Sequence, residues 1–451
     1  MSIHQAITDA ASLIDRWLAY KTEMGRIPGL SVGIVYKNQI ILHQTYGYAN
    51  LEERIPTSKE TGYRIASFSK TFSAIAAMQL AEQGKLNLDV PVSTYVPWFT
   101  NPNDPRVTHI SLRQLLSHTS GLDRDGAAGQ WVTLEFPELP VIQQHVSEGA
   151  MVFDPATQWK YSNFGYTIVG QVIEAVSGEV YNEYVTKHII EPLGLRHTAP
   201  DLNAKAEQEL AVGYSRDIPG QPRERFPQIS TSVMASATGF LSSVPDLLRY
   251  IQAQFPGDTT LLSEESKREM RRIQWLREGL EADQCLGFAT WKVKDWRVYG
   301  HGGGFQGFIT RFAFDPDRQI GIAVLTNAID GPALTLANGA LSVINKFIVD
   351  YDELTKAELA VEHPERFINT YRNIWRDDQI ARIGQSLLRY DPAADVPLEF
   401  VEQLRLNADG SFTVMSGDTY GAYGEKIHFT FDEAGNAQTL IACGNTVERI
   451  G

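Results

Sequence analysis

The sequence predicts an α+β fold in which an antiparallel sheet, flanked by helices and interrupted by a large helical insertion, precedes a small C-terminal all-β barrel. Two groups of strand-like segments lie on either side of nearly 200 mainly helical residues, so the sheet is split in the sequence. A second series of short strands follows residue 366. This order is not the alternation of strands and helices that a doubly wound sheet requires.

The N-terminal part predicts one helix and one hairpin. Apolar residues close to a 3.6-residue spacing, among them Ile7, Ile14 and Leu18, predict an amphipathic helix over residues 5–22. Two strands are expected at residues 30–36 and 39–46, joined by a tight turn between them. From about residue 67 to 250 the pattern is mainly helical, broken by turns rich in Pro, Gly and Asn.

The sheet resumes in the third quarter of the chain. Strands are expected at residues 288–293, 297–300, 308–314 and 320–326. The turn Asp315-Pro-Asp-Arg-Gln joins the last two, and residues 333–348 predict a closing helix. Because the strands come in two groups around a helical insertion, we expect them to pair antiparallel.

Short strands and turns alternate over the last 85 residues or so. The expected strands are at residues 370–375, 379–386, 399–406, 411–415, 426–431 and 439–442. Evenly spaced short strands of this kind are typical of a small meander or barrel. We therefore expect a first domain over residues 1–350, with its helical insertion at about 67–285, a linker over 351–365 and a barrel over 366–451.

Composition excludes several classes of protein. The 451 residues include 40 Lys and Arg against 54 Asp and Glu, a net charge of -14, and an acidic surface disfavours nucleic-acid and anionic-membrane partners. The basic residues between 267 and 277 are interleaved with acidic ones, which predicts a solvated helix face. No apolar run approaches 18 residues, so no membrane span is expected.

Cysteine usage and the first residues predict a cytoplasmic protein. Cys285 and Cys443 are too few and too far apart for a disulfide framework or a cysteine-rich metal site. The N-terminus has no basic segment followed by an apolar one, as a secretory signal would. The ten histidines are scattered and no His-Glu-x-x-His motif occurs, so we expect no metal and no cofactor.

The first chemical motif is Ser67-Phe-Ser-Lys70 at the start of a predicted helix. Residues three apart share one side of a helix, and a serine at its N-terminus has free backbone N–H groups beside it. A desolvated lysine one turn away can lose its proton and activate the hydroxyl. Taken alone, the motif is more typical of an N-cap serine followed by an exposed lysine.

The second motif is Tyr161-Ser-Asn163. A phenol beside a lysine ammonium can have a lowered pKa and act as a general base, and an asparagine can hydrogen-bond both the lysine and a substrate amide. Alone, the same residues are typical of a turn that caps a following helix.

The third motif, His301-Gly302-Gly303-Gly304, lies between strand-like segments. Consecutive glycines allow a substrate to approach the backbone closely. A phosphate-binding loop is excluded because no Lys-Ser/Thr pair follows. Alone, a histidine such as His301 is more often structural than catalytic.

One competing motif is rejected on order and position. Residues 29–33 match the G-x-S-x-G of α/β-hydrolases, with Ser31 as the apparent nucleophile. That fold needs a strand-to-helix turn at the serine and a glycine loop earlier in the chain. Here the segment leads into a strand and the glycines come later.

Together, Ser-x-x-Lys, Tyr-x-Asn about 90 residues later and His-Gly-Gly about 140 residues after that resemble the motifs of penicillin-recognising serine hydrolases. The family includes class C β-lactamases, D-Ala-D-Ala carboxypeptidases, D-aminopeptidases and CubicO-type esterases and peptidases. The resemblance extends over roughly residues 5–348 and includes residues 110–122, 159–166, 191–195 and 237–243. It implies a β-lactamase-like sheet, and the C-terminal segment resembles the lipocalin-like barrel of some CubicO-type peptidases.

The resemblance implies an acyl-enzyme mechanism. Ser67 would attack a carbonyl, Lys70 and Tyr161 would share its proton, and Asn163 would orient the lysine and the substrate. The backbone N–H groups of Ser67 and Gly304 would form the oxyanion hole. Water, or another nucleophile, would then release the acyl group.

The third motif departs from the Lys-Thr-Gly of penicillinases, because His301 replaces a permanent cation with a group that ordinarily titrates near neutral pH. His301, Gly302 and Gly303 would bind substrate. We therefore expect a hydrolase of small peptides or amides of the D-aminopeptidase or carboxypeptidase type. The alternatives are an esterase or acyl transferase, including peptide cyclisation, and a weak β-lactamase or non-catalytic acyl-binding sensor. A homo-oligomer formed through the C-terminal domain is a further expectation.

Overall fold

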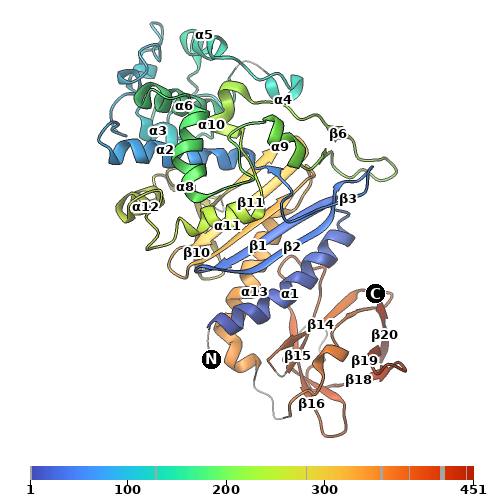
Figure 1. The fold of residues 1–451 in the computed structure, drawn as a ribbon. Helices are drawn as coiled ribbons and strands as arrows, with labels where there is room; N and C mark the ends of the chain where they lie inside the picture. The colour runs from blue at the N-terminus through green and yellow to red at the C-terminus, as the bar shows by residue number, and fades with distance from the viewer. Residues whose placement is uncertain are drawn as a thin grey trace. The chain divides into compact units, whose positions relative to one another are not determined.

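The predicted hairpin and the four later strands lie in one eight-stranded antiparallel sheet, which also contains two short strands that were not predicted, β3 (Ile55–Pro56) and β8 (Ala282–Gln284) (Figure 1). The computed structural model describes residues 3–126, 129–280, 282–355, 359–384, 386–416, 422–442 and 444–450. In spatial order the strands are β3 (Ile55–Pro56), β2 (Gln39–Asn50), β1 (Gly29–Tyr36), β12 (Ile320–Thr326), β11 (Phe308–Asp315), β10 (Trp296–Phe305), β9 (Ala289–Val293) and β8 (Ala282–Gln284). The first strand therefore pairs with the last, with Leu30 opposite Thr326.

The insertion between β2 and β8 is mainly helical, as predicted. Its helices are α2 (Ser69–Glu82), α3 (Leu112–Leu116), α4 (Gln130–Thr133), α5 (Leu139–Gly149), α6 (Asn163–Ser177), α7 (Tyr181–Val185), α8 (Glu191–Leu193), α9 (Ala204–Glu209), α10 (Ala235–Thr238), α11 (Val244–Gln252) and α12 (Glu264–Arg271). Two short ladders join β4 (Tyr63–Arg64) to β7 (Leu241–Ser242) and β5 (Gly213–Tyr214) to β6 (Arg225–Phe226).

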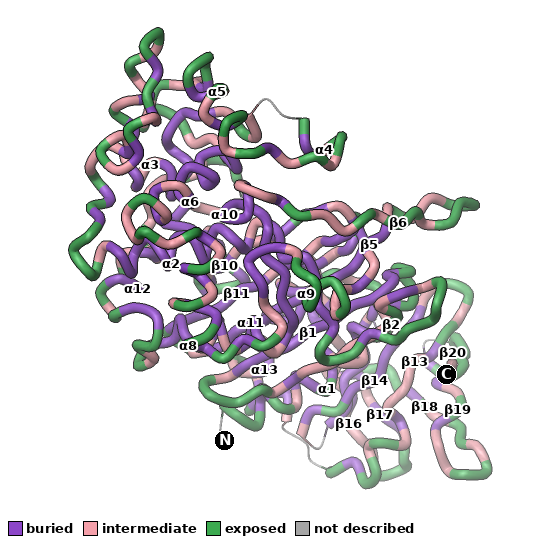
Figure 2. Tube along the Cα trace, turned by 45° about the horizontal axis from the view of Figure 1, so that its top comes forward, coloured by how far each residue is buried: buried purple, intermediate pink, exposed green. Residues whose placement is uncertain are grey.

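Helix α11 packs directly on strands β1 and β12, and Gly33 makes this approach possible. A Cβ at Gly33 would lie 2.4 Å from Val244 and 2.7 Å from Leu248. The apolar core between the sheet and the helices includes Phe72 and Phe312. Figure 2 shows buried chain concentrated in the sheet and the central helices, whereas the α4 and β6 segments lie at the surface.

Helix α2 differs from its prediction in one respect. In the sequence, Phe72, Ile75, Ala76 and Leu80 fit one helical face, which predicts a helix buried on one side. In the structure every residue from Ser69 to Leu80 is buried. The helix is surrounded by neighbours that include α6 and α10. Small residues such as Ala74 and Ala77 allow these neighbours to approach from several sides.

The basic run between residues 267 and 277 is not the uniformly solvated helix face that was predicted. Lys267 is 2% exposed, and its ammonium donates to the carbonyl oxygens of Phe255 and Asp258. Helix α12 ends at Arg271, and Arg277 follows in a loop. Interleaved charges thus indicated exposure for Lys267, which is buried and has specific partners.

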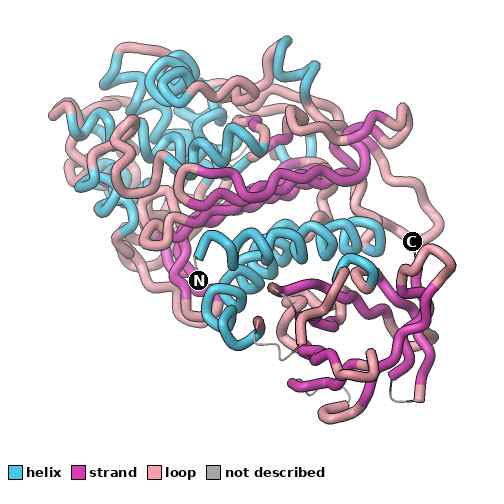
Figure 3. The backbone as a smooth tube through the Cα atoms, turned by 60° about the horizontal axis from the view of Figure 1, so that its bottom comes forward, coloured by secondary structure: helices cyan, strands magenta, loops and turns pink. Residues whose placement is uncertain are grey.

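Eight C-terminal strands close into a barrel, which confirms the predicted second β region (Figure 3). They are β13 (Thr370–Arg372), β14 (Asp377–Ile383), β15 (Ser386–Tyr390), β16 (Val401–Leu406), β17 (Phe412–Ser416), β18 (Lys426–Phe431), β19 (Ala437–Ala442) and β20 (Asn445–Ile450). Aromatic residues fill the interior, with Phe367 in edge contact with Phe412 and Phe429. The predicted α+β class with a C-terminal barrel is confirmed.

The N-terminal helix α1 and most of the helix α13 that precedes the barrel belong to the same compact unit as the barrel. This unit joins residues up to Arg26 with those from Thr335 onward, and the other unit spans Ile27–Leu334. Helix α1 (Ile3–Met24) donates from Tyr20 to Asp377, and Tyr351 of α13 (Ala333–Leu354) donates to Asp9. The predicted domain limits at 350 and 366 stay a prediction. Cys443 and residues 356–358 of the predicted linker lie outside the described residues.

Candidate active site

Ser67 and Lys70 lie at the start of the buried helix α2. Ser67 is the middle residue of a short 3₁₀ turn, Ala66–Phe68, that leads directly into the helix. Ala66 has a φ of 48°, a left-handed conformation that non-glycine residues seldom adopt. The Ser69 hydroxyl donates to the Ala66 carbonyl at 2.5 Å and accepts from the backbone N–H of Phe240, which fixes this turn.

Lys70 is fully buried, and three atoms surround its ammonium. Its Nζ lies 3.2 Å from Ser67 Oγ, 2.7 Å from Asn163 Oδ1 and 2.8 Å from the carbonyl oxygen of Ala237. Burial lowers the pKa of Lys70 well below its ordinary value, and the charge of Asp125 opposes that shift in part. The interpretation as an exposed lysine behind a capping serine is therefore wrong.

The partners of Lys70 determine what a neutral amine would do there. The oxygens of Asn163 and Ala237 can only accept, so they take two N–H groups. A neutral amine has two such groups and one lone pair. The lone pair is then left for the third neighbour, Ser67 Oγ.

Tyr161, from the second motif, also contacts Ser67 Oγ. Its hydroxyl donates to Ser67 Oγ at 2.7 Å, and Lys70 Nζ lies 4.8 Å from the centre of its ring. Burial raises the pKa of Tyr161, and the hydrogen bond to Ser67 only partly offsets this. The expected lowering of the phenol pKa is wrong, because desolvation outweighs the neighbouring charges, so Tyr161 is protonated at rest.

Asn163 and its neighbour begin helix α6. The Ser162 hydroxyl caps the helix by accepting from the backbone N–H of Gly165 at 2.7 Å, as the second motif allowed. Asn163 donates through Nδ2 to Asp125 Oδ1 at 2.6 Å, so its Oδ1 is turned toward Lys70. Within this motif Ser162 therefore caps the helix, whereas Asn163 contacts Lys70.

The third motif lies within strand β10 rather than between strands. The strand packs along the turn that carries Ser67, and a Cβ at Gly303 would lie 2.1 Å from the carbonyl oxygen of Ile65. At Gly302 a Cβ would lie 3.0 Å from a guanidinium nitrogen of Arg311, its cross-strand partner. The glycines therefore permit close packing on both sides, and Gly304 beyond them is exposed.

His301 does not titrate near neutral pH, in contrast to the expectation. Burial is the main cause that lowers its pKa to about 3, and the charges of Arg311 and Arg277 act in the same direction. Its Nδ1 lies 2.6 Å from the carbonyl oxygen of Gly302, so that nitrogen carries the proton. Its ring centre is 6.4 Å from that of Tyr161.

Two residues that the motifs did not identify support this cluster. His118, with a φ of 59°, lies against the Tyr161 ring at 4.4 Å and accepts from the backbone N–H of Ser162 at 3.1 Å. Burial lowers the pKa of His118 well below its ordinary value, so its ring is neutral. Asp125, which orients Asn163, also accepts from Trp131 Nε1 at 2.8 Å.

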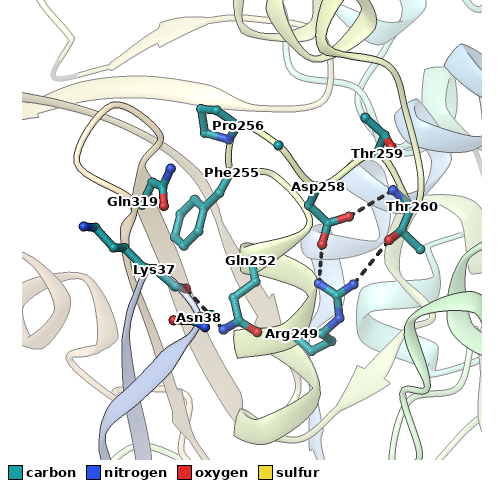
Figure 4. Close-up of a pocket in the computed structure, with 11 residues that line it drawn as sticks. Lys37, Asn38, Arg249, Gln252, Phe255, Pro256, Asp258, Thr259, Thr260 and Gln319 are labelled. Carbon is teal, nitrogen blue, oxygen red and sulfur yellow. Dashed lines mark hydrogen bonds and ion pairs between the residues drawn. The ribbon is translucent and has the colours of Figure 1, made fainter.

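A separate hollow of about 690 Å³ is lined by polar and charged side chains, among them Lys37, Arg249 and Asp258 (Figure 4). It lies where the turn at Lys37 meets the segment after α11. Arg249 in its wall is paired with Asp258 at 2.7 Å, and Gln252 donates to the carbonyl of Lys37 at 3.2 Å. Ser31 is buried in β1, 3.0 Å from the hydroxyl of Tyr63, so the rejected G-x-S-x-G motif does not form a nucleophile turn.

Neither a metal cluster nor a membrane helix is found in the described part of the chain. No group of three or more His, Cys, Asp and Glu side chains there could hold a metal ion. None of the helices described is long and apolar enough to cross a bilayer.

Comparison with known proteins identifies the fold. The model of the Beta-lactamase family matches residues 14–341. Protein flp of Staphylococcus aureus strain MW2 is 28% identical over 323 residues, which are 71% of this chain and 63% of that protein. The chain thus spans less than two thirds of the length of the curated relatives it matches first.

Three solved structures share the architecture. The octameric penicillin-binding protein homologue from Pyrococcus abyssi is 22% identical, covers 97% of this chain and 99% of its own, and has a TM-score of 0.66. A mutant class C β-lactamase (22% identical, 74% and 97% covered) has a TM-score of 0.63. A D-stereospecific amidohydrolase from a Streptomyces species (24% identical, 75% and 98% covered) has a TM-score of 0.62.

Proposed function

Because the chain belongs to the Beta-lactamase family, we propose that it is a serine hydrolase that acts through an acyl-enzyme on small peptides or amides. The observation that carries the proposal is the pair of hydrogen bonds at Ser67 Oγ. Tyr161 donates to this oxygen. A neutral Lys70 amine uses its two N–H groups on Asn163 and Ala237, which leaves its lone pair for the Ser67 hydroxyl. The serine proton therefore has a defined acceptor.

The acylation step follows from this arrangement. Ser67 Oγ bonds to the substrate carbonyl carbon while its proton passes to Lys70 Nζ. The negative charge that develops on the carbonyl oxygen is stabilised by the backbone N–H groups of Ser67 and Gly304, where loss of one donor typically costs about 10²–10³ in rate. The Lys70 ammonium then returns the proton, directly or through the Tyr161 hydroxyl, to the leaving nitrogen as its bond to carbon breaks.

Deacylation reverses these roles. A water that takes the place of the leaving group gives its proton to neutral Lys70 and attacks the acyl carbon, and Ser67 Oγ leaves with a proton from the same relay. Asn163 holds the lysine, and neutral His301 with Gly302 and Gly303 lies along the substrate. If an amine or alcohol replaces water, the same steps give acyl transfer or cyclisation.

A peptidase of D-residue substrates is preferred over an esterase for two reasons. Expulsion of an amine needs a proton at nitrogen, and the buried Lys70–Tyr161 relay supplies one. A D-stereospecific amidohydrolase also shares the fold. The esterase, acyl-transferase and weak β-lactamase alternatives use the same acyl-enzyme and differ in the substrate.

The test compares wild type with Ser67→Ala on four substrates. These are D- and L-aminoacyl p-nitroanilides, a short-chain p-nitrophenyl ester and a chromogenic cephalosporin. We expect Ser67-dependent cleavage of the D-anilide, and an acyl adduct on Ser67 by intact-protein mass spectrometry. Turnover of the ester alone would favour the esterase alternative. Equal rates in Ser67→Ala would contradict the whole scheme, and ligand binding without turnover in wild type would indicate a sensor.

We also propose that the chain forms a homo-oligomer, because the Pyrococcus abyssi homologue of similar length is octameric. Light scattering coupled to size exclusion tests this directly. A monomer at micromolar concentration would contradict it.

A further inference from the structure

The C-terminal barrel contains a cavity at one end, lined by residues of the barrel itself. Its volume is about 380 Å³. The β13–β14 turn contributes Trp375 and Arg376 to the lining, and the ends of β19 and β20 contribute Ala442 and Val447. A hollow of this size at the mouth of a barrel is typical of a site for a small molecule.

Three charged side chains point into this end of the barrel. Ile380 belongs to the apolar interior and lies opposite Arg389 across the β14–β15 ladder, and Arg389 in turn lies opposite Glu402. Residues two apart on a strand share one face, so Asp378 points inward with Ile380. The three charged residues are only 1–4% exposed. Asp378 and Arg389 line the cavity.

The contacts among these charges leave Asp378 and Arg389 incompletely compensated. Arg389 Nε lies 2.8 Å from a carboxylate oxygen of Glu402 and 3.9 Å from Asp378 Oδ2. Arg376 Nη2 lies 2.7 Å from Asp378 Oδ1. Neither Asp378 Oδ1 nor Arg389 Nε forms an aligned hydrogen bond with a described residue, close as their ionic partners are. Burial raises the pKa of Asp378, although both arginines oppose the shift.

The cavity also offers an apolar surface beside the charges. Ala442 and Val447 are buried in its wall, and the Trp375 indole, which is 79% exposed, stands at its rim. Buried charges without aligned hydrogen bonds are costly, and a large ring in water gains nothing from burial. Both features favour a ligand that carries charges of both signs and an apolar group.

We propose that this end of the barrel binds a small free α-amino acid in its zwitterionic form. The ammonium donates to Asp378, the carboxylate accepts from Arg389, and the side chain packs on Trp375. Opposite charges whose nearest atoms are 3.9 Å apart match a ligand whose own charges are separated by a single carbon. A simple anion or cation satisfies only one of the two partners. This function goes beyond the proposed hydrolase activity and does not rest on it.

The test is calorimetric titration of the full chain with valine and two analogues that each lack one charge. Isobutylamine is valine without its carboxylate, and 3-methylbutanoate is valine without its amine. Both enantiomers of valine are titrated. We expect one of them to bind about 10- to 100-fold more tightly than either analogue, the range for one hydrogen bond between charged groups.

Two variants assign each charge of the ligand to its partner. Asp378→Asn keeps the shape of the side chain but removes its charge, so valine should lose about 10- to 100-fold in affinity while 3-methylbutanoate binds as before. Arg389→Lys keeps the charge but loses the planar fork, so valine and 3-methylbutanoate should both bind less tightly while isobutylamine is unaffected. A merely structural role would change the binding of all three ligands together.

Two further variants locate the ligand and control for charge. Valine should change the tryptophan emission of wild type, and Trp375→Phe should remove that change in a protein that still folds, because this ring is exposed. Arg382→Gln removes an exposed cation near the other end of β14, which donates to the carbonyl of Gly384 at 2.6 Å. Its affinity for valine should equal that of wild type.

Three results would overturn the inference. Either analogue could bind as tightly as valine, so that a single charge suffices. Valine could bind equally well to Asp378→Asn of unchanged melting temperature, which would place it at another site, the candidate active site included. Wild type could show no saturable binding of either enantiomer. All of these measurements are of binding, so their outcome is independent of whether Ser67 is a nucleophile.

Discussion

Lys70 and Lys267 are both buried, and their surroundings lead to opposite expectations. Each ammonium donates to backbone carbonyl oxygens, but Lys267 also lies 3.2 Å from the carboxylate of Glu264. The acid nearest to Lys70 is Asp125, which reaches it only through the amide of Asn163. Lys267 and its partners hold a loop, whereas burial lowers the pKa of Lys70 and allows it to act as a base. The adjacent carboxylate, rather than burial, separates the two roles.

The largest expected effect is on Lys70. Lys70→Met removes the proton acceptor, so kcat/KM should fall by about 10³-fold or more. The fold should persist with some loss of stability, because the change leaves Asn163 Oδ1 and the carbonyl oxygen of Ala237 without their donor. Steady-state rates and circular dichroism check both statements. A variant that keeps more than a tenth of the activity would remove Lys70 from the mechanism.

The matching change at the other lysine should affect stability instead. Lys267→Met leaves the carboxylate of Glu264 and two carbonyl oxygens without their donor, so we expect a loss of about 3 kcal/mol in the free energy of unfolding. The kcat of the folded protein should be unaffected. Urea denaturation and active-site titration measure the two quantities. A lower kcat with normal stability would mean that the comparison between the lysines does not hold.

Asp125→Asn tests the distant carboxylate of Lys70. The variant keeps an oxygen that can accept from Asn163 but loses the negative charge that raises the pKa of Lys70. The pKa of Lys70 should fall further, so the acid limb of the kcat/KM profile should move to lower pH, with about a 10-fold loss of rate from weaker orientation. A limb that moves to higher pH would contradict this assignment.

His301→Asn serves as the control for the acid limb. Because the pKa of His301 is about 3 in the folded protein, protonation of this histidine cannot produce a limb above pH 5. The position of the limb should therefore stay the same, whatever happens to the rate. A shift of the limb would show that His301, and not Lys70, titrates there.

The smallest effect concerns His118 and folding. Its pKa is well below the ordinary 6.5 in the folded protein, so the unfolded chain binds the extra proton and stability falls as the pH drops below about 6.5. Between pH 6.5 and 5.5 this one residue should contribute a loss of about 1 kcal/mol. His118→Phe should flatten that part of the dependence in urea melts, although its overall stability is lower. An unchanged slope would contradict a buried neutral ring.

Much of the fold was predictable because its strands have clear patterns. The hairpin turn at Lys37–Asn38 and the turn at Asp315 set strand limits that the structure reproduces within a few residues. Strand β15 was missed because all five of its residues are buried and the alternation of period two is absent. Strand β20 was missed for the opposite reason, since polar residues such as Glu448 and Arg449 occupy most of it.

The chemical cluster was predictable only as far as its motifs extend. Ser-x-x-Lys and Tyr-x-Asn located Lys70 and Tyr161 beside Ser67 Oγ, and Asn163 beside the Lys70 ammonium. The protonation states were not predictable, because the pKa of Tyr161 and of His301 depends on burial that the sequence does not reveal. The resembling segment at 110–122 did contain His118, but nothing in its pattern indicates a ring in contact with Tyr161.

The pairing of β1 with β12 has a consequence for how the chain folds during synthesis. Leu30 pairs with Thr326, so the central sheet has a high contact order. During synthesis, the β1 edge of the N-terminal hairpin has no partner strand until almost 300 further residues have been made. At ordinary translation rates that interval is on the order of 15–60 s. An apolar strand left open for that long is an aggregation hazard, so the nascent chain is expected to depend on a chaperone that covers strand edges.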